Sequence, residues 1–295
     1  MPKHADAPLR PQGRVKTQES CYHAAMVSQR FPRATCALFL SHGGGPLPLL
    51  GDPAHVEMVQ SLESIAAAID RPEAIIVISA HWEERVATIS SAAKPEIIYD
   101  YYGFPPESYE IKYPAPGHPA LASRLHACLR DNGVAAELDA DRGFDHGLYI
   151  PLKIMYPDAD IPCIQLSLMS SLDPAAHIAL GEAMSDIGGD GVLVIGSGFS
   201  FHNLKAFFSS DASRPDERNK AFERWLIDTC AGADLDEVER TRRLLHWADA
   251  PHARYCHPRG EHLLPLHVCY GMAKRAAEAV VELRILNKKA SFYLW

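Results

Sequence analysis

Short apolar runs alternate with amphipathic segments along most of the chain. The run from Ala37 to Leu40 stops at a glycine-rich segment, SHGGGP at 41–46, and the run at 74–81 contains four consecutive β-branched residues. Neither run alternates apolar with polar positions, so both predict strands that are covered on both faces. Residues 161–168 and 191–198 predict two further buried strands, the second ending in glycines.

Helical spacing separates these strands. Apolar positions recur with helical period over 54–69, 118–132 and 174–187, and residues 152–155 also favour a helix. Residues 215–248 predict polar helices, 261–283 one long apolar helix, and 291–295 a last strand. The aromatic and proline-rich stretch at 99–117 predicts a long functional loop.

Strands that alternate with helices predict an α/β fold with a central sheet flanked by helices on both faces. We expect a single domain over residues 34–295. Residues 1–33 mix charges with Pro, Gln and Ser, which predicts a disordered N-terminal extension.

The composition of the chain argues against several classes of binding partner. The 295 residues carry a formal net charge of −8, which argues against nucleic acid or an anionic membrane surface. No apolar run has the length of a membrane span or the form of a secretory signal. Seven cysteines without a CxxC pair favour reduced thiols, and we therefore expect a cytoplasmic protein. Monomer and homodimer both remain open.

The candidate functional residues are found among the fifteen histidines of the sequence. His42, His81 and His202 follow predicted strands, at the edge of the sheet where α/β proteins build binding sites. His146 lies in a GFDHG loop before a helix, and His262 follows Glu261 at the start of the predicted long helix.

Any one of these residues could be an ordinary core histidine or a helix-capping acid. Together they fit a metal site made of strand-end histidines and a helix-borne ligand. Imidazole suits Zn, Cu, Fe or Ni, and two histidines with a carboxylate and open positions suit non-haem Fe(II). HExxH and cysteine clusters, the commonest zinc patterns, are absent from the sequence.

Seven motifs in order carry a family resemblance from about residue 35 onward: SHGGGP at 41–46, SAHWE at 79–83, YGFPPESYEIKYPAPGHP at 102–119, GFDHG at 143–147, MYPDADIPCIQLSL at 155–168, FHNL at 201–204 and EHLLPL at 261–266. The chain resembles the class III extradiol ring-cleavage dioxygenases, in particular the DOPA 4,5-dioxygenase-like branch. That branch is related to the catalytic subunit of protocatechuate 4,5-dioxygenase.

The resemblance implies a mixed α/β sandwich with one mononuclear Fe(II) site, which Zn(II) can occupy in isolated protein. It implies His42 and His81 as metal ligands. The third ligand is His262 or Glu261, because adjacent helical residues diverge by about 100° and only one can face the metal. We favour His262.

The resemblance also implies two catalytic histidines. His202 matches the acid/base residue and is a further candidate ligand, whereas His146 matches a residue that contacts the substrate or bound oxygen. The SHGGGP motif departs from the shorter Gly-Ser-Pro form usual in the DOPA-like branch, and this difference leaves the substrate open.

The function implied is oxidative opening of a catechol-type ring, with O2 and a small aromatic diol as partners and DOPA-like compounds among the candidate substrates. In the expected mechanism, His202 acts as the base that removes one proton from the diol. Four aromatic residues of the 99–117 loop are candidate walls for the ring, with core packing as the alternative for each: Tyr102, Phe104, Tyr109 and Tyr113. Two alternatives are a zinc-dependent hydrolase on the same scaffold and a binding or metal-handling protein without catalysis.

Overall fold

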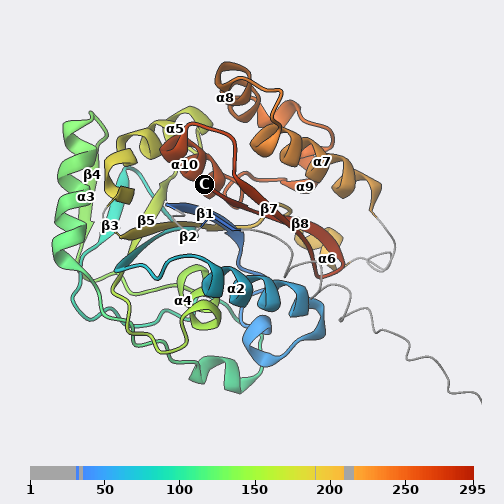
Figure 1. The fold of residues 1–295 in the computed structure, drawn as a ribbon. Coiled ribbons are helices and arrows are strands. Elements are labelled where there is room, and N and C mark those ends of the chain that lie inside the picture. The colour runs from blue at the N-terminus through green and yellow to red at the C-terminus, as the bar shows by residue number, and fades with distance from the viewer. Residues whose placement is uncertain (1–30, 33–35, 190, 209–215) are drawn as a thin grey trace, which may run out of the picture. The chain divides into compact units, whose positions relative to one another are not determined.

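The computed structural model of the protein describes residues 31–32, 36–189, 191–208 and 216–295 (Figure 1). The predicted extension at 1–33 lies outside the described residues except for Phe31 and Pro32. The predicted domain start at residue 34 lies outside them as well.

One mixed sheet organises the part of the chain that the structure describes. Its eight strands follow the order β4-β3-β5-β2-β6-β1-β8-β7. The central strands β5, β2, β6 and β1 are parallel, whereas β3 and β8 run antiparallel to their neighbours β5 and β1. The bounds are β1 (Ala37–Ser41), β2 (Ala74–Glu84), β3 (Ala87–Ser90), β4 (Ala136–Asp139), β5 (Cys163–Met169), β6 (Val192–Gly198), β7 (Ala279–Ile285) and β8 (Lys288–Leu294).

Helices cover both faces of the sheet (Figure 1). Helices α2 (Val56–Ala68) and α4 (His146–Met155) pack on one face, and α5 (Pro174–Ala183) and α10 (Leu264–Ala273) pack together on the other. The remaining helices are α3 (Pro119–Asp131), α6 (Leu204–Phe207), α7 (Glu217–Ala231), α8 (Glu237–Leu245) and α9 (Ala253–Cys256). Short 3-10 turns are η1 (Leu47–Leu50), η2 (Pro53–His55), η3 (Pro106–Glu110), η4 (Ser185–Gly189) and η5 (Trp247–Asp249).

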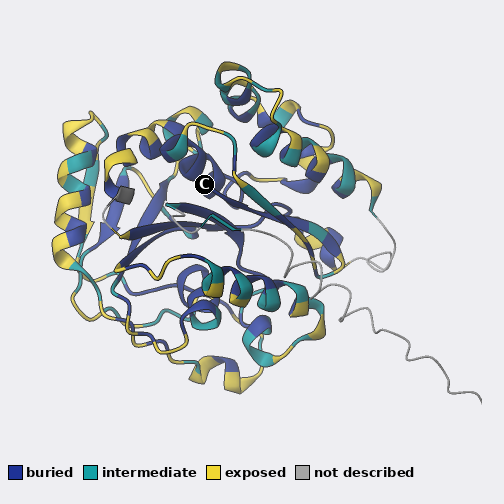
Figure 2. Cartoon of the chain, viewed as in Figure 1, coloured by how far each residue is buried: buried dark blue, intermediate teal, exposed yellow. Residues whose placement is uncertain are grey.

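The central strands are buried along nearly their whole length (Figure 2). In β1 and β6 every residue is buried, and in β2 the first seven are. This double coverage explains why the runs show no polar alternation. The prediction of an α/β fold with a central mixed sheet and helices on both faces is confirmed.

The predicted helix over 261–283 is confirmed only for residues 264–273. Helix α10 ends at Ala273, and Lys274 adopts a left-handed backbone with φ 47° that stops it. The chain then forms the hairpin of β7 and β8, joined by Leu286 and Asn287 with φ of 50° and 62°. Two consecutive positive φ angles are typical of the tight turns that connect hairpin strands. Residues 281–285 do alternate buried and exposed, which is the strand signal that the apolar run before them obscured.

Several boundaries also differ from the sequence patterns. Strands β3 and β4 were not predicted, since each has only four residues. Strand β2 continues past His81 to Glu84, and α4 begins at His146, before the predicted helical residues. Within the described residues no helix is long and apolar enough to cross a membrane.

Candidate metal centre

His42 is positioned by the glycine-rich loop that follows β1. Its backbone N–H donates to the Gly198 carbonyl at the end of β6 over 3.1 Å. Gly43 then adopts φ +85°, and a Cβ there would lie 2.9 Å from both Met58 Sδ and Pro48 Cγ. Glycine adopts this turn without the strain that a side chain would cause. The loop therefore holds the His42 side chain in the interior, at 1% exposure.

His81 lies at an irregularity in β2. The register between β2 and β5 shifts between Ser79 and Glu83, and such shifts re-aim side chains. Ser79 Oγ accepts from the His81 backbone N–H over 3.2 Å and donates to Asp145 Oδ1 over 2.8 Å. The buried Asp145 thus supports the irregular backbone from the start of α4.

His262 lies on the turn that leads into α10, not on a helix as predicted, because α10 begins at Leu264. Its carbonyl accepts from the Phe199 N–H over 2.9 Å. A Cβ on Gly198 would lie 2.1 Å from the same carbonyl oxygen, so this close approach requires glycine. The end of β6 therefore fixes the backbone of His262 as well as that of His42.

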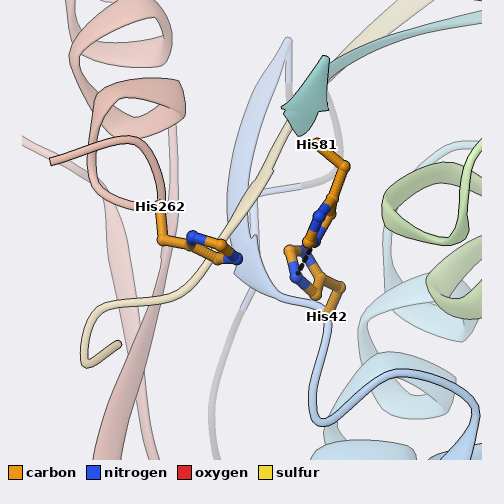
Figure 3. A group of neighbouring side chains, drawn as sticks. All are labelled: His42, His81 and His262. Carbon is orange, nitrogen blue, oxygen red and sulfur yellow. Dashed lines mark hydrogen bonds between the residues drawn. The ribbon is translucent and has the colours of Figure 1, made fainter. Parts of the chain in front are cut away.

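The three histidines converge although they come from three different elements (Figure 3). The Nε2 atoms of His42 and His81 are 2.9 Å apart. The three possible ligand atoms, one from each residue, all lie within 4.8 Å of one another. Two nitrogens held by one ion at about 2.1 Å and at right angles would be about 3.0 Å apart. The observed spacing therefore fits two ligands of a single cation.

The contacts of His42 Nδ1 determine which ring nitrogen carries the proton. Ser197 Oγ donates its only proton to the Gly147 carbonyl over 2.5 Å and lies 3.0 Å from His42 Nδ1. The hydroxyl must therefore accept from Nδ1–H, and the neutral ring keeps its lone pair on Nε2. A ring nitrogen oriented in this way by a second group is typical of metal-binding histidines.

Glu261 orients His262 in the same manner. Its Oε1 lies 2.9 Å from His262 Nδ1 and 3.3 Å from His202 Nδ1. Burial raises the pKa of Glu261, but the hydrogen bonds of His202 and His262 outweigh burial and hold it well below its usual range. An ionised carboxylate only accepts, so His262 donates through Nδ1 and its Nε2 is free for a cation.

The three imidazoles are neutral. Burial is the main cause that lowers the pKa of His42, His81 and His262, the last to about 3, and neighbouring histidines lower it further. Neutral rings are the form that binds metal ions. The donor set of three neutral imidazoles thus fits a Zn(II) or Fe(II) ion.

Two more histidines border this cluster. The rings of His202 and His262 stack with centroids 3.4 Å apart, and His202 with Glu261 and His262 forms a second possible ligand group. His146 opens α4, and its ring centroid lies 3.9 Å from that of His81. Its Nδ1 lies 2.9 Å from Asp100 Oδ1, which also accepts from the His146 backbone N–H over 3.0 Å.

All five histidines line one cavity of about 410 Å³, within the usual range for small-molecule sites. The rest of its wall is apolar: Gly43, Gly44, Gly45, Leu47, Tyr101, Tyr102, Phe104, Phe199, Leu204, Phe207, Phe208 and Leu286.

The structure brings only part of the predicted aromatic set to this cavity. Tyr102 and Phe104 line it, whereas Tyr109 and Tyr113 are not among its lining residues. Tyr113 is buried elsewhere at 1% exposure, and its hydroxyl donates to the Tyr156 carbonyl over 3.2 Å. The 99–117 loop is thus partly a wall of the site and partly core.

Sequence reasoning missed the residues that hold the histidines. Ser79 and Asp145 lie inside the quoted motifs, Ser197 lies in the glycine-bracketed end of β6, and Asp100 lies at the start of the aromatic loop. For Ser79 and Asp145 the available signal was their proximity to His81 and His146 along the chain. Asp100 contacts His146 from 46 residues away and Ser197 contacts His42 from 155 residues away, so the local sequence carried no signal for either. His55 was also missed: its Nε2 accepts from the Gly44 N–H over 3.0 Å and so supports the glycine loop.

Several known proteins are similar in sequence to this chain. Residues 36–292 match the family model described as the catalytic LigB subunit of aromatic ring-opening dioxygenase. The dioxygenase tasH of Hapsidospora irregularis is 44% identical over 251 residues, which cover 79% of this chain and 76% of that protein. The 4,5-DOPA dioxygenase extradiol of Beta vulgaris is 38% identical over 245 residues, covering 82% and 88%.

A bacterial protein and a solved structure are also similar to this chain. The 4,5-DOPA dioxygenase extradiol of Escherichia coli K12 is 35% identical over 241 residues, covering 82% of this chain and 84% of that protein. The crystal structure of an uncharacterized Escherichia coli K12 protein superposes with a TM-score of 0.70 at 31% identity. It covers 88% of this chain and 98% of its own.

Proposed function

The chain belongs to the aromatic ring-opening dioxygenase family of the catalytic LigB subunit, and we propose that it is an Fe(II)-dependent enzyme that opens a catechol-type ring with O2. The observation that carries this proposal is the convergence of three buried imidazoles, with the Nε2 atoms of His42 and His81 2.9 Å apart, in a largely apolar cavity of about 410 Å³. Family membership favours ring opening over a zinc-dependent hydrolase or a non-catalytic metal-handling protein.

His42, His81 and His262 are the proposed ligands of the ion. When bound with open coordination positions, Fe(II) would supply the redox chemistry that lets a catecholate react with O2. Glu261 is assigned to orienting His262, because its Oε1 faces the Nδ1 atoms of His262 and His202.

His202 is the proposed general base. A catechol must lose a proton before both of its oxygens can chelate a metal, and His202 lines the cavity next to His262. Its Nδ1 faces the Glu261 carboxylate at 3.3 Å, which leaves Nε2 to take the proton from a substrate hydroxyl. The carboxylate then balances the positive charge of the protonated ring.

His146 is proposed to contact the substrate or oxygen from the opposite side of the cluster. Asp100 lies 2.9 Å from its Nδ1 and can balance a charge on the ring. A hydrogen bond donated from such a ring would stabilise negative charge that develops on oxygen during ring opening.

Oxygen uptake tests the proposal. Protein loaded anaerobically with Fe(II) is mixed with a panel of catechols, and O2 consumption and product spectra are recorded. We expect uptake with at least one catechol, a coloured ring-opened product, and a loss of 10²-fold or more in His202→Ala. The matched control is His246→Ala, which removes an exposed histidine at the end of α8. Absence of uptake by fully iron-loaded protein across the panel would refute the proposal.

A further inference from the structure

In the part of the chain that the structure describes, the cavity wall has no lysine, arginine or carboxylate to pair with a charged substituent. Among the described residues that line it, the five histidines are the only titratable groups apart from tyrosine hydroxyls, and no Lys, Arg, Asp or Glu takes part. Tyr101 donates its hydroxyl to the Ser108 carbonyl over 2.6 Å, so it presents its ring rather than a free polar group. Lys205, the neighbour of Leu204, is exposed and does not line the cavity.

The mouth of the cavity is apolar as well. Tyr102, Leu204 and Phe208 line the cavity and are 90%, 59% and 77% exposed, so they mark the side on which it opens to solvent. They come from two separate segments, the 99–117 loop and the region of α6. Large apolar side chains that gather at one exposed place usually mark a binding surface for an apolar partner.

The nearest carboxylates are already engaged by histidines. Asp100 lies 2.9 Å from His146 Nδ1, and Glu261 lies 2.9 Å from His262 Nδ1. An ammonium group on the substrate would have to compete with these contacts, and a carboxylate would meet no Lys or Arg side chain among the described residues that line the cavity. Removing either charge from water without a partner is costly.

We propose that the ring substrate of this enzyme carries an uncharged, apolar substituent that leaves the cavity between Tyr102, Leu204 and Phe208. This inference rests on the proposed ring opening, since it names the substrate class of the same site. Amino-acid catechols and carboxylated catechols are then poor substrates, and alkyl or aryl catechols are good ones.

A matched substrate series tests the inference. The kcat/KM of the Fe(II)-loaded enzyme is measured with 4-methyl-, 4-ethyl-, 4-propyl- and 4-tert-butylcatechol, and with protocatechuate and DOPA. Each buried methylene is expected to raise kcat/KM by up to about fourfold. The alkyl compounds should exceed both charged compounds by about tenfold or more. Higher kcat/KM for protocatechuate or DOPA would overturn the inference and leave the proposed ring opening intact.

A charge placed at the mouth provides a second arm. Phe208→Arg should raise the kcat/KM for protocatechuate relative to 4-tert-butylcatechol by about tenfold, because it supplies the missing cation. Val238→Arg adds the same charge at a 79% exposed site on α8 outside the cavity, and should leave that ratio unchanged. Equal changes in both variants would contradict a role of the mouth in selecting the substituent.

Binding without turnover separates this inference from the proposed function. Metal-loaded protein is titrated calorimetrically, in the absence of O2, with 4-tert-butylphenol and with 4-hydroxybenzoate. We expect the alkylphenol to bind at least tenfold more tightly. Equal or reversed affinities would refute the apolar preference, whatever the outcome of the oxygen-uptake assay.

Discussion

The carboxylate of Glu261 accepts a hydrogen bond from His262 Nδ1 over 2.9 Å, and the other ring nitrogen of His262 then faces His42 and His81 (Figure 3). In the proposed site these sequence neighbours therefore have different roles, Glu261 as the acid that orients the ring and His262 as the candidate ligand. Because Glu261 Oε1 also lies 3.3 Å from His202 Nδ1, one carboxylate connects the candidate metal site with the candidate base.

Replacement of Glu261 should weaken metal binding without abolishing it. Glu261→Gln keeps an oxygen acceptor for His262 but loses the charge, and we expect metal affinity to fall by about 10- to 100-fold. His262→Ala should lose more, since it removes a ligand. Competition with a chromophoric chelator measures both. An equal loss in the two variants would instead make Glu261 itself a ligand.

Ser197 should matter for metal affinity through the ring of His42. Ser197→Ala leaves His42 Nδ1–H and the Gly147 carbonyl without their partner, which we expect to cost about 1–3 kcal/mol of stability. Metal affinity should fall by about 10-fold or more. Ser197→Thr keeps the hydroxyl, so its metal affinity should stay close to that of the parent. Its stability should still fall, because the extra methyl must fit a fully buried site.

Ser61→Ala is the matched control for Ser197. Ser61 is equally buried, and its hydroxyl donates to the Glu57 carbonyl within α2 over 2.6 Å. It should lose stability in chemical denaturation but keep the metal affinity of the parent. A similar loss of affinity in Ser61→Ala would show that the effect of Ser197 is only structural.

A side chain at Gly43 should disturb the site, whereas one at Gly51 should not. Both glycines have positive φ, +85° and +74°, so alanine at either position costs about 1–2 kcal/mol. A Cβ at Gly43 also meets Met58 and Pro48 at 2.9 Å, while nothing lies within 4 Å of one at Gly51. Gly43→Ala should therefore lower metal affinity and activity beyond its effect on the melting temperature. Unchanged affinity in Gly43→Ala would show that the loop adapts without moving His42.

Glu223 should make stability depend on pH. Burial raises its pKa to about 7, although hydrogen bonds from Ser200 and Ser291 oppose the shift. The native state therefore holds this proton more tightly than the unfolded chain does. The contribution to the free energy of unfolding is full below about pH 4.5 and is lost as pH rises to about 7, a decrease of roughly 3 kcal/mol.

Glu223→Gln should remove that decrease, so that the variant gains stability relative to the parent at pH 8 but not at pH 4.5. Denaturant unfolding at both pH values provides the measurement. Glu63→Gln, which changes an exposed residue of α2, is the control and should leave the pH profile unchanged. A parallel pH profile in parent and Glu223→Gln would contradict the assignment.

Local patterns predicted much of the fold because they depend on contacts between residues close in sequence, or on whether a strand is buried on one face or on both. The uninterrupted apolar runs of β1, β2 and β6 follow from burial on both faces, and they were recognised. The end of the helix predicted over 261–283 was not, since Lys274 ends α10 and strand β7 after it pairs with β8. That pairing is a contact between strands, and the local apolar content of 261–283 does not show it.

The sequence by itself determined which residue types stand at the strand ends, and therefore that His42, His81 and His202 were candidates. Only the tertiary structure decided which side chains meet. The strand order β2-β6-β1 places His42 and His81 on either side of β6, and the turn before α10 returns to the end of the same strand with His262. Tyr113 shares the aromatic loop with Tyr102 but packs into the core. Convergence depends on non-local strand pairing, and that pairing is a property of the whole chain rather than of any one motif.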